Sequence, residues 1–279
     1  MNPTPAPPTR HPPRPPALGA VPIRDVIAAE WLKIRSVRST HHILVALALA
    51  VLAGVAVASA MVADWDTSPP ADQAVFGTAN VGILTIPFAQ FCLAALGGLA
   101  VTAEYGSGSI QPSLVAVPRR LALLAGKAVV VAAGTLVVGQ LVAFVSFAAT
   151  WLIVGDRPPP IAPWQPGAAA DGIAVTLSAG LSLVVAGLVG LGIGTAVRST
   201  AGMLVTVTAL LFVLPSVVEF LPGPWGDRLG AVSLTNLVVE LAGTLPDAPL
   251  SPVGALAALA GYVLLALGAG AVVLTRRTG

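Results

Sequence analysis

Charged side chains that could take part in chemistry are few in this 279-residue sequence, and they gather in two stretches. The first contains Glu30 and Lys33 ahead of a long apolar run, and the second contains Glu104 and the pair Arg119 and Arg120. Glu104 ends a predicted helix, where the helix dipole opposes a negative charge, so we expect it to have a basic partner. Arg119 or Arg120 can reach it if the intervening loop folds back, and the alternative is a solvated loop.

Motifs of known catalytic chemistry are missing. Lys127 follows the glycine of the chain's one Gly-Lys pair, but no glycine lies five positions before that glycine, so there is no phosphate loop. The stretch 105–109 lacks the first glycine of a nucleophile elbow. Three histidines and one cysteine, Cys92, provide no metal cluster. We therefore expect no catalytic residue, no metal and no ATP hydrolysis by this chain itself.

The composition excludes a soluble fold. Hydrophobic residues make up 56% of the chain and charged residues 9%, and the mean hydropathy is +0.90. A soluble domain has about 25% charged residues. The net charge of +2 is too small to indicate a nucleic-acid partner. The composition therefore predicts a polytopic membrane protein in contact with the lipid bilayer.

Six apolar runs are long enough to cross a membrane, since a span needs about 20 residues. We predict an all-α membrane protein with an N-terminal amphipathic helix and six transmembrane helices. The expected organisation is a Pro-rich disordered tail over 1–22, an interfacial helix over 23–40 and a six-span domain over 41–279. The predicted spans are 43–63, 81–103, 126–154, 173–197, 201–221 and 253–274.

The distribution of charge predicts the orientation of the spans. With six spans, one side carries 12 of the 14 basic residues and the other carries nine of the 12 acidic ones. Basic residues accumulate on the cytoplasmic side of membrane proteins. We therefore expect a multi-pass protein of the cell membrane with both termini in the cytoplasm.

Two segments outside the spans have open interpretations. The helix over 23–40 has one apolar arc, into which Glu30 projects; it is either a generic juxtamembrane segment or a helix that packs on the bundle with Glu30 paired. The 30-residue segment 222–251 contains an apolar stretch too short to cross the membrane. It is either a re-entrant or outer-surface helix or an ordinary external loop.

Three strings resemble the ABC-2 type transporter permeases, especially those of high-GC actinobacteria. They are Ala29 to Thr40 before the first span, Glu104 to Ile110 after the second and Val117 to Arg120 before the third. The resemblance implies a six-span subunit that dimerises and binds two cytoplasmic ATPase subunits. It also implies a connecting helix over 30–38 and a coupling loop over 104–120, although Pro112 departs from the family pattern and could shorten a coupling helix.

The function that the resemblance implies is the permease subunit of an ATP-binding cassette exporter. ATP and Mg would be bound by a separate subunit, and the second permease copy could be identical or different. The alternative is a polytopic membrane protein without an ATPase partner, such as a membrane enzyme, a passive pore or an assembly scaffold. The candidate residues for coupling to the ATPase are Glu30, Trp31, Lys33, Arg35, Arg38, Glu104, Tyr105, Gly106, Arg119 and Arg120.

The substrate is not evident from the sequence. Four polar residues of the spans could line a transport path, and each could equally form a hydrogen bond with a neighbouring helix. An apolar path would suit amphiphilic or drug-like substrates. These four residues are Asn80, Gln90, Gln140 and Ser146.

Overall fold

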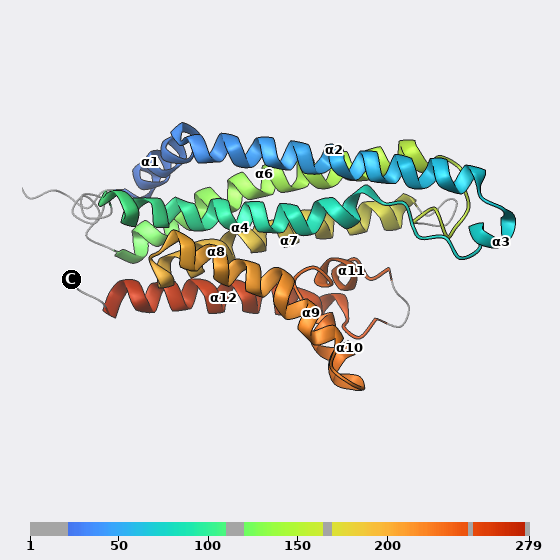
Figure 1. The fold of residues 1–279 in the computed structure, drawn as a ribbon. Helices are drawn as coiled ribbons and strands as arrows, with labels where there is room; N and C mark the ends of the chain where they lie inside the picture. The colour runs from blue at the N-terminus through green and yellow to red at the C-terminus, as the bar shows by residue number, and fades with distance from the viewer. Residues whose placement is uncertain (1–21, 110–119, 164–168, 245–247, 277–279) are drawn as a thin grey trace, which may run out of the picture.

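The computed structural model describes residues 22–109, 120–163, 169–244 and 248–276, and in these ranges the regular secondary structure is entirely helical. Most of the chain forms a bundle of long helices that run nearly parallel to one another (Figure 1). The Pro-rich tail, apart from Pro22, lies outside the described residues. The elements are α1 (Ile23–Ser36), α2 (Arg38–Thr67), α3 (Pro70–Gln73), α4 (Val81–Ser107), α6 (Arg120–Val154), α7 (Ala169–Val197), α8 (Thr200–Thr208), η1 (Ala209–Val213), α9 (Leu214–Glu219), α10 (Pro224–Ala231), α11 (Leu237–Ala242) and α12 (Pro252–Arg276).

Six segments are long and apolar enough to cross a membrane, which confirms the predicted all-α membrane class. Each overlaps a predicted span. The fifth is assembled from α8, η1 and α9, and the other five are single helices. The six segments are Arg38–Thr67, Val81–Ser107, Arg120–Val154, Ala170–Val197, Thr200–Glu219 and Pro252–Arg276.

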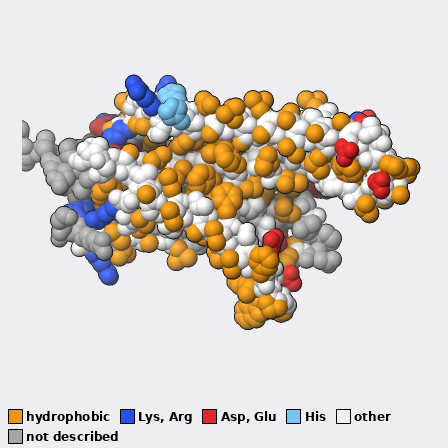
Figure 2. Space-filling model, in the orientation of Figure 1, with side chains coloured by type: hydrophobic (Ala, Val, Ile, Leu, Met, Phe, Trp, Pro, Cys, Tyr) orange, Lys and Arg blue, Asp and Glu red, His pale blue; other side chains and the backbone are white. Residues whose placement is uncertain are grey.

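The two ends of the bundle differ in charge. We call the end that holds α1 and the last turn of α12 the basic end, and the opposite end, near α3, the acidic end (Figure 1). Lys and Arg side chains gather at the former and Asp and Glu at the latter on the face shown in Figure 2. At the acidic end, Arg157 is held by Asp66 through two hydrogen bonds of 2.8 and 2.7 Å.

Helix α7 lies at the centre of the bundle and packs directly against α4, α6 and α12. Small residues make this close packing possible. A Cβ atom on Gly190 would collide with the main-chain oxygen of Ala94, and one on Gly97 would collide with that of Gly187. The backbones of α4 and α7 are therefore in contact, as expected for small residues spaced four apart in a membrane helix.

Helix α6 is long enough to pass beyond the membrane core. Its 35 residues extend about 52 Å, against a core of about 30 Å. Its first turns pack against α1, where Gly126 leaves room for Val26: a Cβ on that glycine would lie 2.8 Å from Val26 Cγ1. The predicted helix over 23–40 is shorter in the structure. Val37 is extended (φ −83°, ψ 131°), so α1 ends at Ser36 and the next helix begins at Arg38.

The fifth span is interrupted. Between α8 and α9, residues Ala209–Val213 form a π-helical turn, and Pro215 follows it. A proline removes one helical hydrogen bond, and π turns and prolines are the usual causes of kinks. Beyond this point α9 and α10 diverge from the other helices (Figure 1).

Candidate functional site

A network of four charged side chains joins three helices at the basic end. The ammonium group of Lys127 on α6 donates hydrogen bonds to Glu30 Oε2 on α1 at 2.7 Å and to Glu104 Oε1 on α4 at 2.8 Å. Lys33 Nζ also donates to Glu30 Oε1 and to Glu104 Oε1, both at 2.8 Å. The two acids and two bases balance, and each lysine bridges both carboxylates.

Three of the four side chains are enclosed by protein, and Lys33 is the partly exposed member. The side chains of Lys127 and Glu30 are 2% and 4% exposed, whereas that of Lys33 is 43% exposed. A third hydrogen bond, to the main-chain oxygen of Ala100 at 2.9 Å, completes the coordination of the Lys127 ammonium. A buried charge is tolerated only when it is paired and hydrogen-bonded. The deeply buried charges of Lys127 and Glu30 therefore depend on their pairing with each other.

The pKa of Lys33 reflects this environment. Partial burial lowers the pKa, but hydrogen bonds to Glu104 and Glu30 and the attraction of both carboxylates outweigh that effect. The net result is a pKa above the ordinary value of 10.5. Lys33 is therefore positively charged at physiological pH and holds both carboxylates from the solvent side of the network.

The sequence correctly placed Glu30 on the apolar arc of α1, and the structure favours the interpretation in which it pairs with the bundle. Glu104 accepts from Lys33 and Lys127, so the predicted pairing with Arg120 is wrong. Arg120 Nη1 instead donates to the main-chain oxygen of Leu274 on α12 at 2.8 Å, and Arg119 lies outside the described residues. The long helix α6 directs Arg120 toward α12 and brings Lys127, two turns later, to the carboxylates.

Lys127 is the central residue that sequence reasoning missed. At the level of sequence it served only to exclude a phosphate loop and as one of the 12 basic residues of the predicted cytoplasmic side. A signal was present, because it is a single lysine within the apolar run 121–154. An ionisable residue inside a span is rare and nearly always has a partner within the protein.

The other candidate coupling residues lie around the network without joining it. Tyr105 is half-buried, and the guanidinium carbon of Arg198 lies 5.4 Å from the centre of its ring. Arg198 itself has a positive φ of 59° at the end of α7 and donates to the main-chain oxygen of Val273 at 3.0 Å. The remaining described candidates are exposed at this end: Trp31, Arg35, Arg38 and Gly106.

A second polar site lies within the half of the bundle nearer the acidic end. Gln90 on α4 is fully buried, and its amide donates to Leu234 O at 3.3 Å and accepts from Thr235 Oγ1 at 3.0 Å. On α12, the Tyr262 hydroxyl donates to Val232 O at 3.0 Å. Gln90 and Tyr262 lie nine and ten residues inside their helices, so the turn that they hold reaches about 13–15 Å into the bundle.

These hydrogen bonds distinguish between the two interpretations of segment 222–251. They favour a re-entrant segment over an ordinary external loop. Residues 232–242 of the segment fold back into the bundle, because the irregular turn and α11 pack between α4, α7 and α12, whereas α10 lies away from them (Figure 1). Leu234 and Leu237 are buried there. Non-helical backbone at membrane depth is stable only where protein satisfies its polar groups, and Gln90 and Tyr262 do so here.

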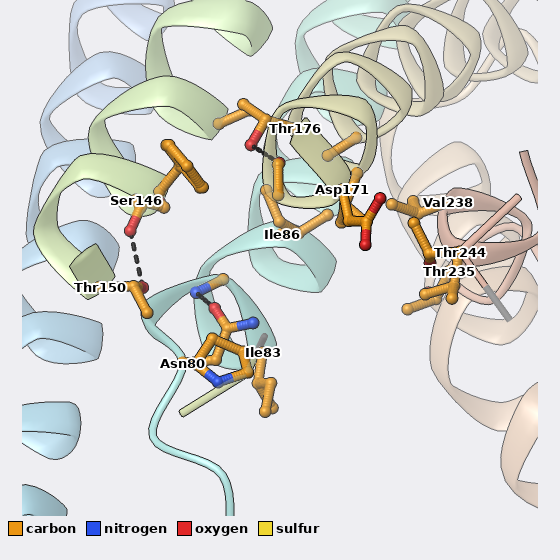
Figure 3. A pocket seen from close by; sticks show the side chains of 18 of the residues that line it. Asn80, Ile83, Ile86, Ser146, Thr150, Asp171, Thr176, Thr235, Val238 and Thr244 are labelled. Carbon is orange, nitrogen blue, oxygen red and sulfur yellow. Dashed lines mark hydrogen bonds between the residues drawn. The ribbon is translucent and has the colours of Figure 1, made fainter. Parts of the chain in front are cut away.

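The four candidate path residues separate into two pairs. Gln90 and Gln140 bind neighbouring elements, the latter by donating to Leu177 O at 3.2 Å. Asn80 and Ser146 instead line a cavity between α4, α6, α7 and α11 (Figure 3). The structure thus favours a helix-bridging role for the two glutamines. Asn80 caps α4 by accepting from Gly82 N at 2.7 Å, and Ser146 is buried in the cavity wall.

The fold and its six apolar segments define a multi-pass helical membrane protein. A scan against models of known protein families finds no match, and a search of curated proteins finds no significant match either. The function must therefore be argued from the sites themselves.

Proposed function

We propose that this chain is the membrane subunit of an ATP-binding cassette exporter of the ABC-2 type. It acts with a second permease copy and with a separate ATPase subunit that binds ATP and Mg, and it lies in the cell membrane with both termini in the cytoplasm. The resemblance of its charged strings to that family supports the proposal, as does the meeting of Glu30 and Lys33 of the first string with Glu104 of the second.

The observation that carries the proposal is the bond of Lys127 to both Glu30 and Glu104. Through it, the interfacial helix α1, the end of α4 and the beginning of α6 form one unit at the basic end. A force applied to any of these elements is transmitted to two spans at once. An ATPase subunit bound here would move whole helices rather than a loop.

The surface around this unit suits a protein partner. Arg24 and Arg35 are exposed on α1, together with Trp31, which is 41% exposed. Arginine and tryptophan are enriched at the centres of protein interfaces. Because basic residues mark the cytoplasmic side, this surface would face the compartment in which ATP is available.

The experiment is purification of the full chain in mild detergent together with the products of its neighbouring genes. We expect a phosphate-loop ATPase to accompany it and its hydrolysis rate to depend on the permease. Alanine at Trp31 and Arg35 should weaken this association, whereas alanine at Asp72, on the far end of the molecule, should not. If no ATPase accompanies the wild-type chain, the proposal fails.

A further inference from the structure

The cavity that Asn80 and Ser146 line has a volume of about 600 Å³, within the range of pockets that bind drug-sized molecules. It lies between α4, α6 and α7, and its other side is formed by Thr235, Asn236, Val238, Val239 and Thr244. Ser146 is eight residues before the end of α6, so the cavity extends about 12 Å inward from that end. Its floor therefore lies within the membrane-spanning part of the bundle.

The cavity wall combines an apolar surface with one charge. Its apolar lining includes Ile83, Ile86, Phe147 and Val175. Among the described lining residues, Asp171 is the one that carries a charge. Figure 3 shows its carboxylate turned across the cavity toward Val238 and Thr244.

Asp171 lacks a described basic neighbour to neutralise it. Arg157, the described basic residue of the connection between α6 and α7, is already bound by Asp66 on α2. The other described charges of the acidic end are mostly carboxylates, which favour a cation further. The electrostatic environment of the cavity rim thus attracts positive charge.

A second polar group lies deeper in the cavity. Ser146 is 2% exposed, and its hydroxyl has no hydrogen-bond partner within the described structure. The neighbouring hydroxyls are already engaged: Thr150 donates to Ser146 O at 2.8 Å and Thr176 donates to Gly172 O at 2.6 Å. A buried polar group without a partner is costly, so a ligand that supplies one gains affinity.

We propose that this cavity binds a compact amphiphilic cation. Its positive group pairs with Asp171 at the rim, its apolar body packs against Ile86 and Phe147, and a hydrogen-bonding group reaches Ser146. As a substrate site of an exporter this inference rests on the proposed function, but binding itself requires no ATPase. The site lies within a single chain, so it is complete without a second permease copy.

The test measures binding of rhodamine 6G, a fluorescent amphiphilic cation, to the purified chain in phosphatidylcholine nanodiscs. Nile red, an uncharged apolar dye, serves as the comparison, and empty nanodiscs provide the background. We expect Asp171→Asn to weaken rhodamine 6G binding about tenfold, as expected for loss of one charge contact, and to leave Nile red unchanged. Ser146→Phe should fill the cavity and abolish specific binding of both dyes.

Asp72→Asn is the matched control, because this acid lies at the same end on α3 and does not line the cavity. Ser146→Ala, which removes the hydroxyl with almost no change in volume, checks the hydroxyl should the phenylalanine variant fail to fold. Equal effects of Asp171→Asn and Asp72→Asn would overturn the proposal, as would unchanged binding in both folded Ser146 variants. Specific dye binding by a chain that no ATPase accompanies would support this site and refute the permease assignment. An associated ATPase without specific dye binding would support the permease assignment and refute this site.

Discussion

The ammonium group of Lys127 lies 2.7 Å from the carboxylate of Glu30, although 97 residues separate them in sequence. This bond attaches an interfacial helix to the third membrane span, and Glu104 adds the second span to the same unit. Because the bond is buried, its loss exposes neither charge to water. The consequences for stability and for coupling can be tested separately.

Lys127→Met should lower stability strongly. The variant leaves two buried carboxylates to share Lys33, and breaking a buried ion pair from one side typically costs about 3–5 kcal/mol. The midpoint of thermal unfolding in detergent should fall accordingly. Arg24→Met is the control, since Arg24 forms an exposed ion pair with Asp25 and its loss should have little effect. Equal midpoints for the two variants would contradict the importance of the network.

Glu104→Ala should separate folding from coupling. We expect the variant still to insert in the membrane, because Glu30 remains to pair with both lysines. Substrate-stimulated ATPase activity of the assembled complex should fall several-fold, since α4 is no longer tied to α1. Asp25→Asn is the control, because Asp25 is an exposed acid on α1 outside the network. This variant should keep normal stimulation of the ATPase. Normal stimulation in Glu104→Ala would remove this residue from the mechanism.

The contribution of Lys33 should depend on pH only in the alkaline range. Its pKa in the folded protein exceeds the ordinary value of 10.5, so the stabilisation is fully present below pH 10.5 and is lost as pH rises through the folded-state pKa. The difference in unfolding midpoint between wild type and Lys33→Met should therefore be constant from pH 7 to about 10 and narrow above it. If this difference in midpoint already decreases between pH 7 and 9, the carboxylates do not raise the pKa of Lys33.

Gly190→Val should disrupt the bundle. The added side chain collides with the main-chain oxygen of Ala94. Because the Cβ is fixed to the backbone of α7 and the oxygen belongs to the backbone of α4, neither atom can move aside without shifting a helix. Overpacking of this kind costs about 1–3 kcal/mol or more. Gly261→Val on α12 is the matched control, because a Cβ there meets nothing within 4 Å in the described chain. Size-exclusion profiles and unfolding midpoints should differ between the two variants.

Gln90→Leu should release the re-entrant turn. The substitution leaves Leu234 O buried without its donor, at a cost of about 1–3 kcal/mol. Hydrogen exchange over residues 232–243 should accelerate while that of α7 stays slow. Gln140→Leu breaks a bond at a more exposed position and should leave this segment protected. Unchanged exchange in Gln90→Leu would mean that other contacts hold the turn.

The sequence by itself determined the class of fold, the number of spans and the segregation of charge between the two ends. These properties depend on local length and hydropathy, which a bilayer selects independently of the way the helices pack. Ala186, Gly190 and Gly194 are spaced four apart in the sequence, and small residues at this spacing permit backbone contact whichever helix is the neighbour.

Tertiary structure decided which charges meet. The sequence pointed from Glu104 to Arg119 or Arg120, the nearest basic residues across one loop, whereas its bonds go to Lys33 and Lys127. The same limit applies to Gln90, whose partner Thr235 is 145 residues away. Ion pairs and buried hydrogen bonds are short-range, so their partners are fixed only when the packing of α1, α4, α6 and the re-entrant segment sets the distances between them.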